Sequence, residues 1–265
     1  MSDSLRVDGS VDVGGLPTID LEALAASAAL QRRFDRKYVV EMEALPGLLE
    51  ALGRETHVLE VGGRRSSDYS SVYFDTPDLR TYRDHVQRRR RRFKVRTRHY
   101  GDPTSIMLEV KCKGRRGQTV KHRWAHPGAD AKDLDQHAHR LVARALWEQY
   151  EVIPPSELRP LAETTFERIT LVDVGSGERV TIDLDLTIFA NGRSVRLGSS
   201  HAVVETKTPA RHGSTTRALR SLGLRPEPVS KYCVGIAASH DSVRGNPWMG
   251  VLRRLDQSTT AAELL

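Results

Sequence analysis

FKVRTRHY, residues 93–100, alternates basic side chains with apolar or uncharged ones, and four further stretches repeat this kind of alternation. They are IMLEVKCK (106–113), TVKHRW (119–124), RVTIDLDLTIF (179–189) and VVETKT (203–208). Successive side chains of a strand point to opposite faces, so each stretch predicts a strand with one ionised and one aliphatic face. Lys94, Arg96 and Arg98, for example, share a face. The pattern indicates a sheet curved around a polar ligand, with its apolar side turned outward.

The composition favours one domain that binds an anion, and the strands and helices expected along it make its fold class α+β. The chain has 265 residues, 38% of them hydrophobic, and a formal net charge of +7. That charge favours phosphates, nucleic acid or a membrane surface as partners. Only two cysteines occur, and no apolar run approaches the ~18 residues of a transmembrane helix. We therefore expect a soluble, cytoplasmic chain without disulfides or a membrane segment.

The organisation predicted along the chain is a single domain between two tails. We expect a flexible N-terminal tail over residues 1–16, a barrel domain over 17–245 and a C-terminal tail over 246–265. Additional strands are expected at 37–41 and 69–76, and helices at 44–52, 132–150 and 214–222. The helix over 132–150 is amphipathic and needs an apolar partner, which the outer face of the sheet would supply.

The most basic stretch, residues 88–98, contains eight Lys or Arg residues and no acid. Such a run can be a solvated surface or a nucleic-acid patch. Its second half, however, alternates strictly with Phe93, Val95 and Thr97. The partner strands add carboxylates at matching positions, namely Glu109, Asp183, Asp185 and Glu205. Carboxylates repel nucleic-acid phosphates but bind a divalent ion held with a phosphate, so the pattern favours a phosphate–metal site.

The acidic and histidine residues also have plainer interpretations. A Glu and a Lys two residues apart, as in LEVK (108–111) and VETK (204–207), often form a surface ion pair of small energetic value. Four scattered histidines are interpreted as surface or strand residues rather than metal ligands: His85, His99, His122 and His126. No P-loop, HExxH, paired CxxC or GxSxG motif occurs.

Eight segments in unbroken order between about residues 30 and 240 resemble the VTC domain. They are FDRKYVV (34–40), SSVYFDTPDLRTYRDH (70–85), KVRTRHY (94–100), MLEVKCKGRRGQTVKHR (107–123), FERITL (166–171), RVTID (179–183), VVETKT (203–208) and SKYCVG (230–235). That domain is the polyphosphate polymerase module of the vacuolar transporter chaperone complex. It is grouped with the CYTH phosphatases among the triphosphate tunnel metalloenzymes. The resemblance implies an antiparallel eight-stranded β-barrel, the triphosphate tunnel, with helices packed on the outside.

The resemblance also implies a set of site residues. The cations expected to bind phosphate oxygens and act in catalysis are Lys37, Arg96, Arg98, Lys111, Lys121, Arg168, Arg179, Lys207 and Lys231. Glu205 is the implied ligand of Mn²⁺ or Mg²⁺, with Glu109 and Asp183 as further implied metal ligands. Tyr73 is expected to contact substrate, although it belongs with Asp75 and Tyr82 to an element whose role can equally be structural.

The implied function is transfer of the γ-phosphoryl group of ATP to a growing inorganic polyphosphate chain. A metal-dependent triphosphatase and a non-catalytic polyanion-binding module are the alternatives, because a fold alone does not select the acceptor. The phosphatase branch carries an ExExK signature where this chain has Arg33, Asp35 and Lys37, which favours the polymerase. Expected partners are ATP or another triphosphate and inorganic polyphosphate, without specific nucleic acid. The sequence does not predict the oligomeric state.

Overall fold

The computed structural model describes residues 11–27, 34–114, 118–126, 128, 130–209 and 213–260. The chain divides into two compact units. Unit 1 combines Met1–Ser67, Phe166–Leu186 and Leu197–Val229, and unit 2 combines Asp68–Thr165, Thr187–Arg196 and Ser230–Leu265. The long strands β8 (Arg159–Asp173) and β9 (Glu178–Ala190) contribute residues to both units.

Unit 1 is a small sheet with short helices packed against it. Besides its parts of β8 and β9 it contains β1 (Thr18–Ile19), α1 (Leu21–Ser27), β2 (Phe34–Glu41), η1 (Met42–Ala44), α2 (Leu45–Glu50), β3 (Thr56–Leu59), β11 (His201–Thr208) and α5 (Ser214–Ser221). Strand β11 pairs antiparallel with both β2 and β9. Strand β3 pairs parallel with β1 and antiparallel with β8.

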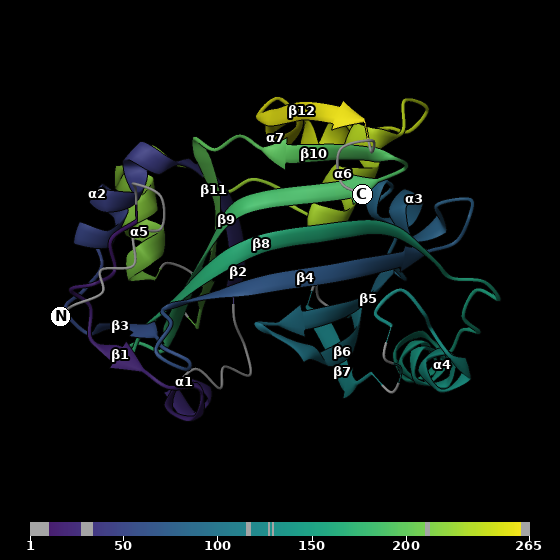
Figure 1. Cartoon of the computed structure of the whole chain (residues 1–265), viewed down its shortest axis with the longest axis horizontal. Helices are drawn as coiled ribbons and strands as arrows, with labels where there is room; N and C mark the ends of the chain where they lie inside the picture. The colour runs from purple at the N-terminus through teal and green to yellow at the C-terminus, as the bar shows by residue number, and fades with distance from the viewer. Residues whose placement is uncertain are drawn as a thin grey trace. The chain divides into compact units, whose positions relative to one another are not determined.

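The strand register of unit 1 separates a charged face from an apolar one. Lys37 of β2 lies opposite Glu205 of β11. The next residue of β2, Tyr38, lies opposite Val204, which in turn faces Ile182 of β9. These last three side chains belong to a buried cluster that includes Leu45 and Leu48 of α2 and Ala218 and Leu219 of α5. Helices α2 and α5 lie side by side over this apolar face (Figure 1).

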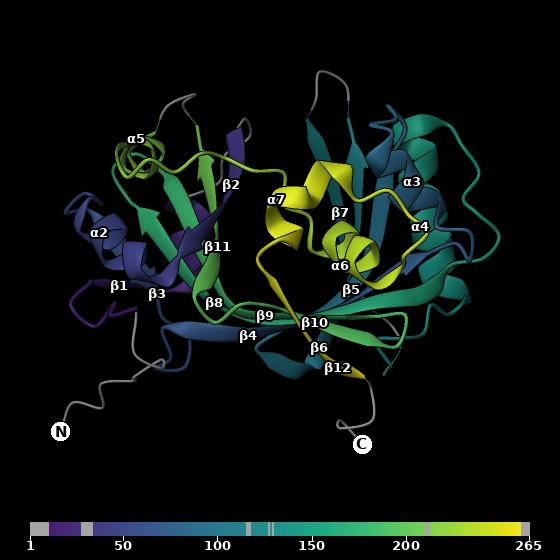
Figure 2. The same ribbon diagram turned by 90° about the horizontal axis from the view of Figure 1, so that it is seen from above.

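Unit 2 is a larger antiparallel sheet with helices. It contains most of β4 (Ser66–Asp75) and β10 (Arg193–Leu197) together with α3 (Arg80–Val86), β5 (Phe93–Tyr100), β6 (Asp102–Lys113), β7 (Thr119–Ala125), α4 (Gln136–Tyr150), α6 (Lys231–Ser239), η3 (Asn246–Trp248), α7 (Met249–Leu252) and β12 (Leu255–Thr260). Strands β4, β5, β6 and β7 pair in that order. Helix α6 lies beside α3 and α7 (Figure 2).

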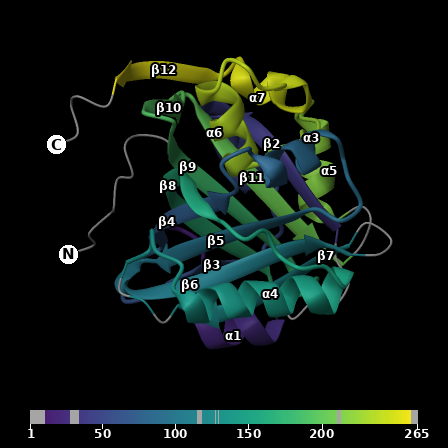
Figure 3. The same ribbon diagram turned by 90° about the vertical axis from the view of Figure 1, so that its right-hand side faces the viewer.

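The β5–β6–β7 sheet repeats the division of faces found in unit 1. Val95, Leu108 and Val110 of the apolar face are completely buried, as are Val142 and Leu146 of α4. Figure 3 shows α4 lying beside β6. The helix begins where the Asp135 side chain accepts a hydrogen bond from the Ala138 backbone N–H at 2.7 Å, an N-cap that fixes its first turn. The outward apolar face predicted from the alternation is thus confirmed in both units.

The predicted helices and strands occur close to their expected positions. Residues 44–52 form the end of η1 and then α2, with Pro46 in the first turn, where a missing N–H costs nothing. Residues 132–150 give α4 from Gln136 onward, and 214–222 give α5. All five alternating stretches are strands. None of the helices in the described residues is long and apolar enough to cross a bilayer.

The expectation of a closed eight-stranded barrel was wrong. The strands form one twelve-stranded sheet, whose main path runs β12-β10-β9-β8-β4-β5-β6-β7 and does not close over the described residues. The difference arises because one strand has different partners at its two ends. In β9, residues 179–183 pair with β11 and residues 187–190 with β10. Between them Asp185 has a positive φ of 50°, which breaks the regular extended strand.

The chain ends only partly fall within the described residues. Residues 1–10 and 261–265 lie outside them. Val11 and Val13, from the expected N-terminal tail, are buried in the core of unit 1. Trp248 and Val251, from the expected C-terminal tail, are buried as well. The single-domain boundaries at 17 and 245 stay a prediction.

Candidate functional site

A single buried carboxylate organises the charged face of unit 2. Glu109 is completely buried and accepts hydrogen bonds from Arg96, whose Nε lies 2.7 Å from Oε2. The Lys121 ammonium and the Tyr100 hydroxyl both contact the other carboxylate oxygen, Oε1. We call these four residues the Glu109 cluster. Every oxygen of the buried carboxylate is therefore compensated by a charged or polar donor, as burial in a low-dielectric interior requires.

Strand register brings the cluster together. Arg96 of β5 lies directly opposite Glu109 of β6, which lies opposite Arg123 of β7. Directly opposed side chains point to the same face of an antiparallel sheet. Arg123 lies beside the cluster, with its Nε 4.0 Å from Glu109 Oε1 and its guanidinium 4.5 Å from the centre of the Tyr100 ring. The alternation of KVRTRHY and LEVK thus places Arg96 and Glu109 side by side on one face of the sheet.

The protonation of the cluster follows from burial and charge. Burial favours the neutral acid of Glu109, but Arg96 and Lys121 outweigh it and hold the pKa of Glu109 far below its usual 4.5. Burial disfavours the charged form of Lys121, and despite the attraction of Glu109 its pKa is lowered to about 8. Near neutral pH Glu109 is therefore a carboxylate held among several cations.

Aromatic side chains surround the neighbouring arginine on the same face. Arg98 Nε donates to Ser71 Oγ at 2.8 Å, and its guanidinium lies 5.2 Å from the centre of the Tyr69 ring and 5.6 Å from that of Tyr100. Such cation–π contacts hold the guanidinium without neutralising it. Arg98 is therefore a buried cation whose position is fixed by a hydroxyl and two aromatic rings.

Tyr73 is the predicted substrate contact on this face. Its hydroxyl accepts a hydrogen bond from Arg96 Nη1 at 3.0 Å, and its ring stacks on Tyr232 with the centroids 5.4 Å apart. Burial favours the neutral phenol, but the positive charges of Arg96, Arg98 and Lys231 outweigh it and lower the pKa of Tyr73 to about 8. The hydroxyl of Tyr73 is thus electrostatically coupled to three of the predicted cations.

The remaining predicted cations of unit 2 are Lys111 and Lys231. Lys111 is half-buried on β6, opposite both Lys94 and Lys121, and so points to the same face as the Glu109 cluster. Lys231 begins α6 directly after the N-cap Ser230 and is buried. Its effect on the pKa of Tyr73 places its charge near that phenol.

Unit 1 carries a second charged face, centred on Glu205. Its carboxylate lies 3.9 Å from Lys37 Nζ and 3.4 Å from Lys207 Nζ, and the Glu205 side chain is 16% exposed. Lys37 Nζ also donates to the Val229 carbonyl at 3.2 Å. We call Lys37, Glu205 and Lys207 the Glu205 face. Both of these ion pairs are longer than a hydrogen bond.

Arg168, Arg179 and Asp183 occupy the same unit. Arg168 forms a bidentate pair with Asp183, with Nε–Oδ1 and Nη2–Oδ2 distances of 2.5 and 2.8 Å. Arg179 lies opposite Lys207 in the β9–β11 register. Because Asp183 lies opposite Val203, two residues from Glu205, it points to the same side of the sheet as Glu205.

The three predicted metal ligands have different surroundings. Glu205 and Asp183 belong to unit 1 and Glu109 to unit 2. Within the part of the chain that is described, no three His, Cys, Asp or Glu side chains cluster as metal ligands would. Glu109 and Asp183 are each bound closely by a guanidinium, whereas Glu205 is partly exposed beside two longer lysine contacts. Of the three, Glu205 fits a divalent ion best, because carboxylate oxygens are the ligands that Mg²⁺ and Mn²⁺ prefer.

Two residues of this site, Tyr100 and Ser71, were not predicted from the sequence. A neighbouring residue, Asp75, has a structural role. Tyr100 follows Arg98 at the same strand parity, a signal that could have identified it, whereas nothing local marks Ser71. Asp75 accepts hydrogen bonds from the backbone N–H groups of Thr81 and Tyr82 and from the Tyr232 hydroxyl, so it fixes the start of α3. Arg33 lies outside the described residues.

The comparisons with known proteins agree with the resemblance seen in the sequence. The VTC domain profile matches residues 32–240. A candidate adenylyl cyclase from Hippeastrum with a dominant triphosphatase activity has 15% identity and a TM-score of 0.50, and the match covers 80% of this chain and 98% of that chain. A candidate adenylate cyclase from Bacillus halodurans has 15% identity and a TM-score of 0.47, covering 74% and 92%. At 15% identity, the likeness to the Hippeastrum protein indicates a shared fold only. No protein of curated function matches the chain.

Proposed function

The chain belongs to the VTC domain family, and on that premise we propose that it is a metal-dependent polyphosphate polymerase. It would transfer the γ-phosphoryl group of ATP to the end of an inorganic polyphosphate chain. The observation that supports this best is the Glu109 cluster, in which one carboxylate fixes Arg96 and Lys121 on a face that also carries Arg98 and Lys111. Such a face suits a ligand with many anionic oxygens.

The cations would act by position and charge. Transfer of a γ-phosphoryl group spreads negative charge over its equatorial oxygens, and preoriented donors stabilise that charge without rearranging. Arg96 and Arg98 suit two-pronged contacts with phosphate oxygens, whereas Lys37, Lys111 and Lys207 provide point charges. The bond between the β-phosphate bridging oxygen and the γ-phosphorus breaks, a terminal polyphosphate oxygen takes its place, and ADP leaves.

Glu205 is the proposed ligand of Mn²⁺ or Mg²⁺, and Lys37 and Lys207 would hold phosphate oxygens beside it. When bound, a divalent ion would neutralise part of the charge on the phosphate oxygens. Glu109 and Asp183 would serve mainly to orient Arg96 and Arg168, because their oxygens already accept hydrogen bonds from those guanidinium groups. Arg179 and Lys231 would add positive charge to the two faces.

Hydrolysis of a triphosphate is the competing reaction at the same residues. It is favoured by the triphosphatase activity named for the Hippeastrum protein, whose fold this chain shares. Polymerisation is favoured because Arg33 and Asp35 stand where the phosphatase signature has two glutamates. Asp35 also lies opposite Lys207, so a cation faces that position.

The test is incubation of the protein with ATP and Mn²⁺, with and without a short polyphosphate primer. Products are separated on a gel with a polyphosphate stain, while ADP and orthophosphate are assayed in parallel. We expect stained polymer with ADP and no equivalent release of orthophosphate. Glu205→Ala should abolish the polymer, whereas Glu163→Ala, which removes a surface carboxylate paired with Lys132, should leave it unchanged.

Each alternative predicts a different result. Orthophosphate without polymer, lost in Glu205→Ala, would assign the protein as a triphosphatase. Binding of polyphosphate that needs no metal, with neither product formed, would identify a non-catalytic polyanion-binding module. Polymer of equal yield from Glu205→Ala would overturn the role given to Glu205.

A further inference from the structure

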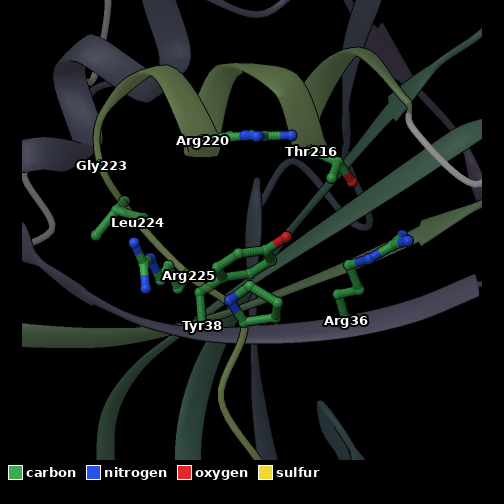
Figure 4. Close-up of a pocket in the computed structure, with 8 residues that line it drawn as sticks. Arg36, Tyr38, Thr216, Arg220, Gly223, Leu224 and Arg225 are labelled. Atoms are coloured by element: carbon green, nitrogen blue, oxygen red, sulfur yellow. The ribbon is translucent and has the colours of Figure 1, made fainter.

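A cavity in unit 1 is lined by three arginines and lies on the side of β2 opposite the Glu205 face. Its volume is about 490 Å³, and its lining comes from β2, α5 and the segment after α5. Figure 4 shows Arg36, Arg220 and Arg225 around the hydroxyl-bearing side chains of Tyr38 and Thr216. Because neighbouring strand residues point to opposite faces, Arg36 and Lys37 serve different surfaces. The cavity is therefore separate from the residues assigned to phosphoryl transfer.

A tight turn after α5 directs the chain back toward β2, which places Arg225 at the cavity. Gly223 has a φ of +76°, a conformation that glycine adopts without strain and that commonly ends helices. The Leu224 N–H donates to the Leu219 carbonyl at 2.9 Å, which closes the turn. The Glu227 N–H then donates to the Lys37 carbonyl at 2.8 Å, joining the segment to β2. The segment that carries Arg225 is thus hydrogen-bonded to α5 at one end and to β2 at the other.

The chemistry of the lining suits an anion. None of the eight lining residues is acidic. The nearby carboxylate Glu178 is not part of the lining, and its Oε2 accepts hydrogen bonds from Ser214 Oγ at 2.8 Å and the Thr215 N–H at 3.2 Å at the start of α5. Three guanidinium groups carry fifteen N–H donors in planar forks that match phosphate oxygens. Tyr38 and Thr216 add two hydroxyl groups.

We propose that this cavity binds a condensed phosphate, either inorganic tripolyphosphate or the triphosphate of a nucleotide. Its volume is within the range of small-molecule sites, roughly 300–1,000 Å³, so the ligand is a small anion. Three arginines that line one cavity favour several linked phosphates over a single carboxylate or sulfate group. The proposal concerns binding alone and does not depend on the reaction that the two charged faces carry out.

The test is isothermal titration of the whole protein with inorganic tripolyphosphate and, separately, with ATP, both without metal. Arg220→Ser/Arg225→Ser removes two exposed cavity arginines, and Arg217→Ser/Arg253→Ser removes two exposed arginines that do not line it. The two double variants have the same net charge. We expect the cavity variant to lose one binding site, or to bind there at least about tenfold more weakly, while the control keeps it.

Further variants separate this site from the charged faces. Lys37→Ser/Glu205→Ala should keep the cavity site, so failure of the proposed polymerase would leave this result intact. Arg225→Glu, a charge reversal, should abolish cavity binding, and circular dichroism melting checks that each variant is folded. If the cavity variants lose binding of tripolyphosphate alone, or of both tripolyphosphate and ATP, the proposal is supported and the result shows which of the two ligands the cavity accepts. Identical isotherms for the cavity and control variants would overturn it.

Discussion

Glu109 contacts Arg96, Lys121 and Tyr100 at once, and none of its surface is exposed to water. A buried carboxylate with this many partners contributes more through what its removal leaves behind than through any single contact. Without it, Arg96 would remain buried beside other cations and without its counter-ion.

We therefore expect Glu109→Gln to destabilise the protein by ~3–5 kcal/mol, since breaking a buried ion pair strands the partner charge. Urea unfolding at neutral pH measures the loss. Glu163→Gln breaks a partly exposed pair with Lys132 and should cost ~1 kcal/mol or less. Equal losses in the two variants would show that the Glu109 cluster does not stabilise the fold.

The pH dependence of the same residue has a definite sign. The pKa of Glu109 is lower in the folded than in the unfolded protein, so the unfolded protein binds the proton first. Its stabilising contribution is complete above about pH 4.5 and is lost as the pH falls below that value. The stability difference between wild type and Glu109→Gln should narrow accordingly in acid unfolding curves. A difference that is constant down to acid pH would contradict this linkage.

Tyr73 gives a second pH signal, on the alkaline side. Its pKa of about 8 lies below the usual 10.0, so one tyrosine should ionise near pH 8 in the folded protein. Ultraviolet absorbance of tyrosinate measures this step, which should vanish in Tyr73→Phe. Between these two pKa values the unfolded protein binds more protons, and the contribution of Tyr73 to stability rises with pH. Identical titrations of both proteins would refute the assignment.

At the scale of the element, each strand of the charged faces also has an apolar face covered by a helix. Helix α4 supplies that cover in unit 2, with Ala138, Val142, Ala145 and Leu146 all completely buried. The helix therefore stabilises the sheet from behind, while the side chains that would bind phosphate point away from it. Stability and ligand binding are assigned to opposite faces of the same strands.

This division predicts that Leu146→Ala lowers the free energy of unfolding by ~2–5 kcal/mol through the cavity it leaves. The neighbouring Trp147 is 60% exposed, and Trp147→Ala should change stability by only ~0.5 kcal/mol. Urea unfolding measures both. Polyphosphate binding per folded molecule should be unchanged in Leu146→Ala. A large loss of affinity in the folded variant would mean that the two faces are not independent.

At the scale of the whole molecule, the formal net charge of +7 adds a long-range attraction to the local contacts. Binding of long-chain polyphosphate should release counterions, and its affinity should fall at least about tenfold between ~50 and ~200 mM salt. Fluorescence titration at several salt concentrations measures this slope. Adenosine, which carries no phosphate, is the control, and an affinity for polyphosphate that is independent of salt would contradict the electrostatic account.

The sequence predicted the charged and apolar strand faces better than it predicted the sheet. Alternation is a local property, so the presence of Arg96, Glu109 and Glu205 on charged faces could be expected from the five short stretches, whereas their partners across the strands could not. The number and closure of strands could not, because they depend on which partner β9 takes on either side of Asp185. The catalytic roles of the charged residues stay predictions.

The cavity could not be predicted from the sequence for a related reason. Arg36 is adjacent to Lys37 in the sequence, but Arg220 and Arg225 reach it from far along the chain through the turn at Gly223. No local pattern links these three arginines, and their proximity results from tertiary structure alone. Ser71, the buried hydrogen-bond partner of Arg98, could not be predicted for the same reason.

Strand β2 carries Arg36 and Lys37 on opposite faces, with Tyr38 in the apolar core. Loss of a single codon within β2 would exchange the faces of every residue beyond it, placing a lysine in the core and an apolar side chain beside Glu205. Loss of two codons would restore the alternation. During evolution, insertions and deletions should therefore accumulate in the loops flanking β2, while the spacing within the strand stays fixed across its lineage.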